Sequence, residues 1–215
     1  DRALDALRDG LQRGLEASHL DHQGVTRLGT PRRMTVHAGG VAVQQPDRRE
    51  TAVGPAEKAA FDGDGKPTRA AEGFARSQGV SVDQLEVRET EKGRYVAVEK
   101  VVPGQAAATL LPAILTEAVR GVPFPKRMRW ADRDFLFARP IRGVMAIFGN
   151  RTLDWELNGV VAGGGTHGHR FLAPDSIEMM SADLDTYKSA LQRACVIVDP
   201  EARLDELGLT TALNG

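Results

Sequence analysis

The sequence has a single cysteine, Cys195, among its 215 residues. One thiol cannot form a disulfide within the chain, which excludes a disulfide-stabilised scaffold and suits a reducing, cytoplasmic location. Long apolar runs are missing too. The longest membrane-like stretch, residues 144–148, is far too short to span a bilayer, so we expect no membrane partner. The net charge is only −1, so any surface that attracts nucleic acid must be local.

The sequence also lacks the usual motifs of catalysis and cofactor binding. It has no nucleophile elbow and no Cys/His nucleophile pattern. The glycine run at 163–165 lacks the lysine and the spacing of a phosphate-binding loop. His167 and His169 could approach one metal ion, but the sequence supplies no third ligand nearby. We therefore predict no catalytic residue, no metal site and no cofactor in this chain, and keep a hydrolytic or metal enzyme using these two histidines as a minor hypothesis.

The order of periodic segments predicts an α+β fold, with mixed and antiparallel sheet segments and packed helices but no doubly wound sheet. Leu4, Leu7, Leu11 and Leu15 recur at spacings of three and four, which is typical of an amphipathic helix. Capping, turn and alternation patterns predict the other elements. These are strands at 34–38 and 41–43, a loop over 45–67, a helix at 69–78 between Thr68 and Gly79, a capping box from Ser81 to Gln84, a hairpin of 87–90 with 95–102, a helix at 106–120, a hairpin of 141–148 with 152–157, a helix at 181–194, a strand at 196–198, and a helix start at Asp199-Pro200.

A basic segment at residues 126–142 is the most informative stretch. Six lysines or arginines face two aspartates there, a local balance of +4 on a chain of −1. Alternation predicts that Met128 and Trp130 anchor the segment in the core while Lys126, Arg127 and Arg129 partly face solvent. Such cations suit a phosphate backbone. Ion pairs and cation–π contacts within the protein are the alternative. The candidate binding residues are Lys126, Arg127, Arg129, Arg139 and Arg142.

A second candidate surface combines Arg32 and Arg33 with a loop at 166–170. The arginine pair precedes a predicted strand, where an anion contact and a structural salt bridge are both open. The three glycines before the loop allow positive φ and close approach to another chain or a phosphate. His169 and Arg170 would then be presented by the loop, with Phe171 buried in the core. The alternative is a purely structural turn.

Several strings, in this order and spacing, resemble the β subunit of bacterial glycyl-tRNA synthetase. They are Thr30-Pro31-Arg32-Arg33-Met34, Gly54-Pro55 followed by Ala59-Ala60-Phe61-Asp62, residues 65–76, Pro125-Lys126-Arg127-Met128-Arg129-Trp130, Arg139-Pro140-Ile141-Arg142, and Thr166-x-Gly168-His169-Arg170-Phe171. The resemblance covers most of this chain but about the first third of such a subunit. It implies that residues 1–203 form the N-terminal body region, with any internal boundary near 104–123, and that residues 204–215 form a divergent or truncated tail.

The resemblance also implies a division of labour. In that heterotetrameric family, the α subunit carries the catalytic core that binds glycine, ATP and Mg²⁺. The β subunit supports charging of tRNA(Gly) with glycine and does not catalyse it. The expected partners are the α subunit and tRNA(Gly), and the expected location is the cytoplasm. A stand-alone RNA- or protein-binding module that reuses this domain is the alternative.

Overall fold

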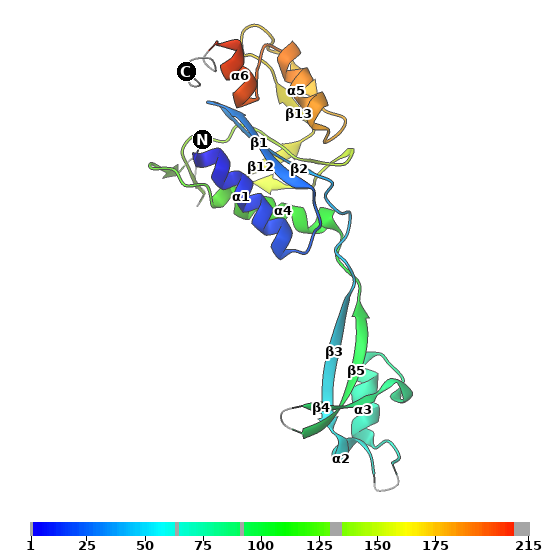
Figure 1. The fold of residues 1–215 in the computed structure, drawn as a ribbon. Helices are drawn as coiled ribbons and strands as arrows, with labels where there is room; N and C mark the ends of the chain where they lie inside the picture. Colours follow the sequence, from blue (N-terminus) through cyan, green and yellow to red (C-terminus); the bar gives the residue numbers. More distant parts are fainter. Residues whose placement is uncertain (1, 63–64, 91–92, 130–134, 209–215) are drawn as a thin grey trace. The chain divides into compact units, whose positions relative to one another are not determined.

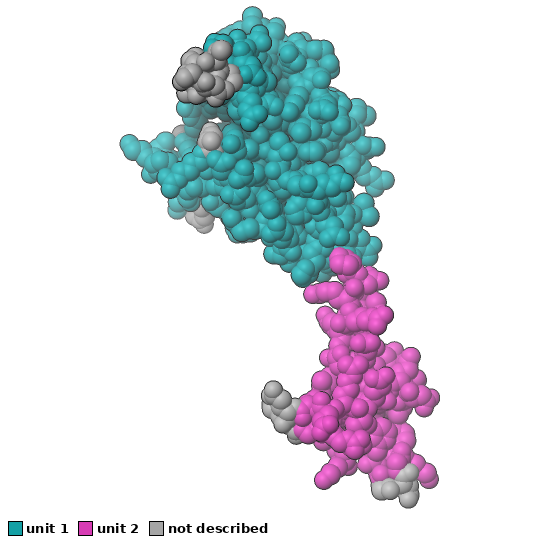
Figure 2. Space-filling model, in the orientation of Figure 1, with its two compact units in different colours: residues 1–45, 105–215 teal, residues 46–104 magenta. Residues whose placement is uncertain are grey.

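A computed structural model of the chain describes residues 2–62, 65–90, 93–129 and 135–208 (Figure 1). The chain divides into two compact units, unit 1 (residues 1–45 and 105–215) and unit 2 (residues 46–104) (Figure 2). The helices of the described residues are α1 (Arg2–Ala17), α2 (Glu57–Ala60), α3 (Arg69–Gln78), α4 (Ala107–Arg120), α5 (Leu184–Arg193) and α6 (Pro200–Glu206), with a short 3₁₀ helix, η1 (Val82–Gln84).

The strands are short and form several small sheets, most of them antiparallel, which confirms the α+β class. They are β1 (Gly24–Thr30), β2 (Arg33–Gly39), β3 (Arg48–Ala56), β4 (Glu86–Thr90), β5 (Gly93–Val102), β6 (Met128–Arg129), β7 (Leu136–Phe137), β8 (Val144–Met145), β9 (Ile147–Phe148), β10 (Arg151–Thr152), β11 (Glu156–Leu157), β12 (Val160–Gly163), β13 (Gly165–His167) and β14 (Ser176–Glu178). None of the helices in the described ranges is long and apolar enough to cross a membrane.

Unit 1 is organised around the β1–β2 hairpin, which the sequence analysis placed wrongly. The predicted strand at 41–43 is absent, and the partner of β2 is instead β1, paired from Gly24↔Gly39 to Thr30↔Arg33. β1 escaped the prediction because glycines weaken the strand pattern at both of its ends. The hairpin turn therefore lies at the Thr30–Arg33 tetrapeptide, not at the glycine pair.

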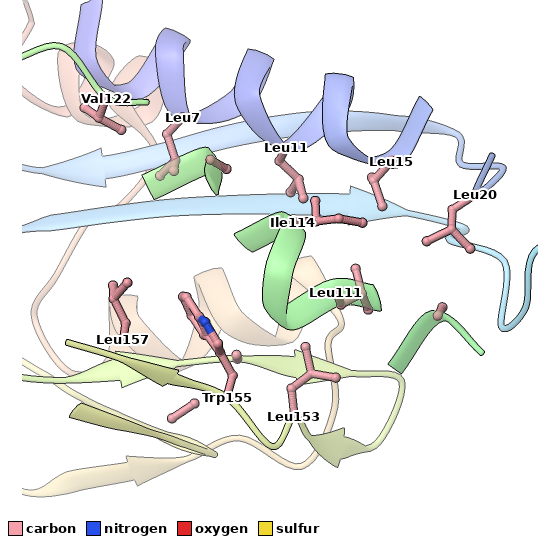
Figure 3. Close-up of a cluster of buried hydrophobic side chains, with 14 residues drawn as sticks. Leu7, Leu11, Leu15, Leu20, Leu111, Ile114, Val122, Leu153, Trp155 and Leu157 are labelled. Carbon is pink, nitrogen blue, oxygen red and sulfur yellow. The ribbon is translucent and has the colours of Figure 1, made fainter. Parts of the chain in front are cut away.

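One face of this hairpin packs against α1 and α4 in the main core. The four predicted leucines of α1 are all buried, as expected. Met34, Val36 and Ala38 of β2 contribute to the same cluster. Trp155 lies on the side of α4 that faces away from α1 (Figure 3). Its indole Nε1 donates to Thr116 Oγ1 at 2.9 Å. The hydrogen bond lets a large aromatic side chain be buried without an unsatisfied donor.

Glycines bring α1 and α4 unusually close together. A Cβ added at Gly10 would lie 3.1 Å from the Cα of Ala118, and one added at Gly14 would overlap Ile114 Cγ2. Ile114 lies at this contact, and Leu7, Leu11 and Leu111 belong to the same buried cluster (Figure 3). The absence of a side chain at these two positions of α1 is therefore a packing requirement.

The other face of the hairpin is covered by α5 and α6. Leu28 of β1 packs with Tyr187, Leu191 and Val198 in a second cluster. Arg203 of α6 donates to the carbonyls of Gly29 and Ile197. The hairpin thus forms the middle layer of unit 1.

The caps of α5 and α6 partly follow the sequence prediction. α6 begins as expected, with Asp199 as N-cap and Pro200 in the first turn. α5 is shorter than predicted because Asp183 accepts the backbone N–H of Thr186 and starts the helix later. Residues 196–198 are not a strand, although Val198 accepts one backbone hydrogen bond from Gly29.

The predicted hairpin of 141–148 with 152–157 is confirmed around its turn at Gly149-Asn150 but is wrong in its outer part. β9 pairs with β10 around a tight turn, while β8 runs parallel to β12, which also pairs with β11. A hairpin of the predicted length cannot form because the chain switches partner between β8 and β9. The alternation itself was correct, since Leu153, Trp155 and Leu157 are all buried.

Unit 2 is a three-stranded antiparallel sheet, in the order β3–β5–β4, with α3 packed on it. The hairpin of β4 with β5 and the helix α3, with Thr68 and Gly79 as its caps, are confirmed, and so is the capping box of Ser81 and Gln84. The predicted loop over 45–67 is wrong, because β3 occupies much of it. Gly54 of β3 leaves room for the ring of Phe74, which is why a glycine stands within a strand.

We expect Gly14→Ala to destabilise unit 1 by about 1–3 kcal/mol, since the added methyl overlaps Ile114 in a tightly packed contact. Urea denaturation followed by fluorescence measures the change. The matched control is Gly73→Ala in α3, where nothing lies within 4 Å and the helix should gain about 0.5–1 kcal/mol. In an Ile114→Ala background, Gly14→Ala should cost less. An equal cost in both backgrounds would contradict the overlap.

A second prediction concerns acid stability. Lys188 donates to Asp199 at 2.7 Å, and this hydrogen bond is the main reason that the pKa of Asp199 lies below its ordinary value. Partial burial opposes the shift, and the N–H of Glu201 adds to it. Because the folded pKa is lowered, the stabilisation is present above about pH 4 and is lost as the pH falls through the folded pKa.

Between pH 6 and pH 3, we expect the unfolding free energy of Lys188→Met to fall less steeply than that of the wild-type chain. Asp199→Asn should behave in the same way, because asparagine keeps the N-cap acceptor but cannot ionise. Asp185→Asn, an exposed position in the first turn of α5, is the control. Parallel acid curves for all four proteins would rule out the linkage.

Candidate functional site

The turn between β1 and β2 holds the two candidate arginines. Arg32 is exposed, and its backbone N–H donates to Thr30 Oγ1 at 3.3 Å. Arg33 is half-buried, and its guanidinium donates to the carbonyl of His167 at 2.5 Å. The structure therefore brings Arg33 and the 166–170 loop together, as a hydrogen-bonded contact and not a salt bridge.

The glycines before this loop serve a different purpose from the one predicted. Glycines 163–165 do not adopt positive φ. A Cβ at Gly165 would lie 2.7 Å from the carboxylate of Glu178, and one at Gly164 would lie 2.9 Å from Thr152 Oγ1. These glycines allow close packing within the chain itself, so the space that the prediction reserved for another chain or a phosphate is already filled.

His169 builds the turn between β13 and β14. Its N–H donates to the carbonyl of Ala194 at the end of α5, and its carbonyl accepts the N–H of Ala173. The imidazole Nδ1 then accepts the backbone N–H groups of Phe171 and Leu172, at 3.3 and 3.2 Å. An acceptor at Nδ1 requires the neutral ring with its proton on Nε2. The turn is thus closed by a histidine side chain.

The prediction that Phe171 packs into the core is wrong. Its side chain is 80% exposed, and that of Leu172 is 70% exposed. Contacts between the backbone N–H groups and His169 close the turn, so the Phe171 ring is not needed to hold it. Arg170 is exposed beside them, as predicted.

Tyr187 ties α5 to the hairpin beneath the loop. Its hydroxyl lies 3.0 Å from Thr35 Oγ1 of β2. Burial raises the pKa of the Tyr187 phenol, against the opposing effects of the Thr35 hydroxyl and the Arg33 charge. The phenol therefore stays protonated at neutral pH and acts as a fixed structural hydrogen-bonding group.

The basic segment forms a separate element, the β6–β7 ribbon and the chain that follows it. Its cations Lys126, Arg127, Arg129, Arg139 and Arg142 are all exposed, which confirms the solvent exposure predicted for the first three. Three phenylalanines, two within this segment and one just before it, pack against one another. The rings of Phe124 and Phe137 meet edge to face at 4.7 Å, and those of Phe135 and Phe137 stack at 5.8 Å.

The predicted anchoring of this segment is wrong in part. Met128 is 53% exposed and does not anchor it. Phe124 and Phe135 pack against the main core instead. These two rings therefore anchor the segment, a role that the sequence pattern predicted for Met128. Trp130 and Arg133 lie outside the described residues.

Four of these cations have no partner inside the described parts of the protein. None of the ion pairs, side-chain hydrogen bonds or ring contacts there involves Lys126, Arg127, Arg139 or Arg142. Chemically, these four guanidinium and ammonium groups pair with no carboxylate among the described residues. Each can therefore contact an external anion, and the alternative of ion pairs within the protein stays open.

Across the described residues, no three His, Cys, Asp or Glu side chains come close enough to hold a metal ion. His169 uses its Nδ1 to accept backbone N–H groups. The two histidines considered as metal ligands therefore differ in their surroundings. His167 is exposed on β13, whereas the side chain of His169 closes the turn.

The sequence analysis missed two features of this region. The acceptor role of His169 depends on a turn that residue types alone do not reveal. The exposed Phe171 was predicted to lie in the core, and the exposure of Leu172 beside it was not foreseen. A weak signal was present, since Ala173-Pro174-Asp175 directly follows the pair and Pro-Asp sequences favour exposed turns.

Comparison with known proteins agrees with the resemblance seen in the sequence. The family model described as "Glycyl-tRNA synthetase beta subunit" matches residues 1–210. The glycine–tRNA ligase β subunit of Trichlorobacter lovleyi is 43% identical over 206 residues, which cover 96% of this chain and 30% of that protein. That of Anaeromyxobacter dehalogenans is 46% identical, over 94% of this chain and 28% of the relative.

The chain spans about 30% of the length of the curated relatives that it matches. The β subunit of Desulfitobacterium hafniense shows the same proportion, with 42% identity over 93% of this chain and 29% of that protein. The match runs through the β1–β2 turn, the basic segment and the His169 turn alike. The chain therefore belongs to the family of glycyl-tRNA synthetase β subunits.

Proposed function

We propose that this chain is a tRNA-binding and structural part of a glycine–tRNA ligase β subunit. In this proposal it supports the charging of tRNA(Gly) with glycine by a separate catalytic α subunit. ATP and Mg²⁺ are bound by that α subunit, and the assembly works in the cytoplasm. The observation that carries the proposal is the family match along residues 1–210.

The exposed cations of the basic segment support the tRNA-binding part. Lys126, Arg127, Arg139 and Arg142 have no partner among the described residues, so a phosphate backbone can contact them without breaking an ion pair within that part of the chain. Phosphate contacts of this kind position an RNA without reading its sequence. The segment is therefore suited to holding tRNA in place.

The chain alone should not activate glycine. Its sequence contains no nucleotide-binding motif, and we assign adenylate formation to the α subunit. Glycine-dependent exchange of pyrophosphate into ATP measures the reaction directly. We expect the chain to match a heat-inactivated sample, and we expect exchange when the α subunit is added. Exchange by the chain alone would overturn this assignment.

Replacing Arg139 and Arg142 by glutamine should weaken tRNA(Gly) binding and flatten its dependence on salt. Removing one cation that touches a phosphate should reduce the slope of log K against log [salt] by about one unit. Arg76→Gln, an exposed cation on α3 in unit 2, is the matched control. Binding of a labelled tRNA(Gly) transcript, titrated at several salt concentrations, measures the slopes. Equal slopes for the wild-type chain and the double variant would show that the basic segment does not contact tRNA phosphates.

A further inference from the structure

The turn at residues 168–175, between β13 and β14, presents two large apolar side chains to solvent. Phe171 and Leu172 are adjacent in sequence and are 80% and 70% exposed. A pair of exposed apolar residues held on one turn marks an interaction site more often than a single scattered residue does. Such a pair can act as a docking element only if the turn that carries it is rigid.

Four hydrogen bonds fix the turn. His169 N donates to the Ala194 carbonyl at 2.8 Å, and Ala173 N donates to the His169 carbonyl at 2.9 Å. The N–H groups of Phe171 and Leu172 both donate to His169 Nδ1. The conformation that exposes the pair is therefore built before any partner arrives, which lowers the entropic cost of binding.

Close packing holds the same turn against the core of unit 1. A Cβ at Gly168 would lie 2.6 Å from the Cβ of Ala194 and 2.8 Å from the carbonyl oxygen of Ala173. Gly168 thus lets the turn rest directly on the end of α5. From the other side, Arg33 holds the carbonyl of the neighbouring His167.

The charges around the pair indicate the character of its partner. Arg170 precedes Phe171 in the turn, and Arg193 directly precedes Ala194, on which the turn rests; both are exposed. Arg33 adds a third cation at the base. Asp175 is the one carboxylate within residues 168–175, and Glu178 on the adjoining strand β14 lies beside Gly165, so the three cations outnumber these two carboxylates. A complementary surface is apolar in the middle and acidic at its edge.

We propose that the 168–175 turn is a docking element that inserts Phe171 and Leu172 into an apolar, acid-rimmed pocket of the catalytic α subunit. The proposal rests on the proposed function and names the surface that the partner binds. The exposed side chain of Leu172 favours a protein partner over an RNA partner. An RNA base could stack on Phe171 beside Arg170, but a flat base would leave the neighbouring aliphatic side chain in water, whereas a protein pocket covers both.

His169 is a positioning residue in this proposal. Its Nδ1 sets the direction of both apolar side chains by holding their N–H groups. Asparagine carries its side-chain oxygen at the same number of bonds from Cβ as the Nδ1 of histidine, so His169→Asn preserves an acceptor there. His169→Leu has a similar bulk but no acceptor. The two variants separate a positioning role from a general packing role.

The experiment measures the affinity of the purified α subunit for the chain, by titration calorimetry. Phe171→Ser should lower it by about 30-fold or more, as expected for a central contact, and Leu172→Ser should lower it by about tenfold. Met180→Ser removes another apolar side chain, 82% exposed, from outside the turn. It should change the affinity by less than about twofold, as expected for an ordinary surface substitution.

The His169 variants test the positioning. We expect His169→Asn to bind like the wild-type chain and His169→Leu to lose most of the affinity. In the His169→Leu background, Phe171→Ser should add little, because the ring is no longer held in place. Circular dichroism melts check that all variants stay folded. If His169→Leu binds the α subunit as tightly as the wild-type chain does, His169 does not position Phe171 and Leu172, and the docking proposal is wrong.

The outcomes also separate the docking proposal from the proposed function. If Phe171→Ser binds the α subunit normally but loses affinity for tRNA(Gly), the turn stacks on RNA and the docking proposal is wrong. If it changes neither, or if it abolishes only self-association or binding to anionic vesicles, the docking proposal is also wrong. If the wild-type chain forms no complex with the α subunit, the proposed function itself fails.

Discussion

The β1–β2 hairpin has two strands in the described part of the chain, so helices must cover both of its faces. Met34, Val36 and Ala38 face α1 and α4, while Leu28 and Thr35 face α5 and α6. Because side chains alternate along a strand, a shift of one residue would exchange the two sets and expose apolar groups on both sides. The strict alternation of this hairpin therefore fixes where every other layer of unit 1 lies.

This frame explains how an exposed loop can have a defined shape. Tyr187 joins α5 to Thr35, and the end of α5 supplies the carbonyl that receives the N–H of His169. Arg33, at the start of β2, holds the carbonyl of His167. The loop is thus attached on one side to the middle layer and on the other to the helix packed on it. Its geometry depends on these contacts with the core and on the close packing that Gly168 allows against Ala194.

Sequence patterns located the elements whose signals are local. Thr68 and Gly79 delimit α3, and the leucines of α1 reveal its buried face, because capping and helical periodicity act over a few residues. β1 and β3 were missed, since their glycines weaken the strand pattern and are justified by distant neighbours such as Phe74. Local sequence patterns could not predict that Met128 and Phe171 are exposed, because the burial of a side chain depends on elements far away in the sequence.

The insertion of unit 2 within unit 1 has a consequence for synthesis. Gln45 and Gln105 hydrogen-bond to each other, so unit 1 is closed by chain segments on either side of a continuous insertion. Roughly ninety residues separate the end of α1 from the start of α4, which at 5–20 residues per second is about 5–20 s of translation. During that interval the leucine stripe of α1 has no α4 to cover it, because all of unit 2 must be synthesised before α4 begins. The nascent chain therefore presents an amphipathic helix that chaperones or neighbouring chains can bind before its own partner exists.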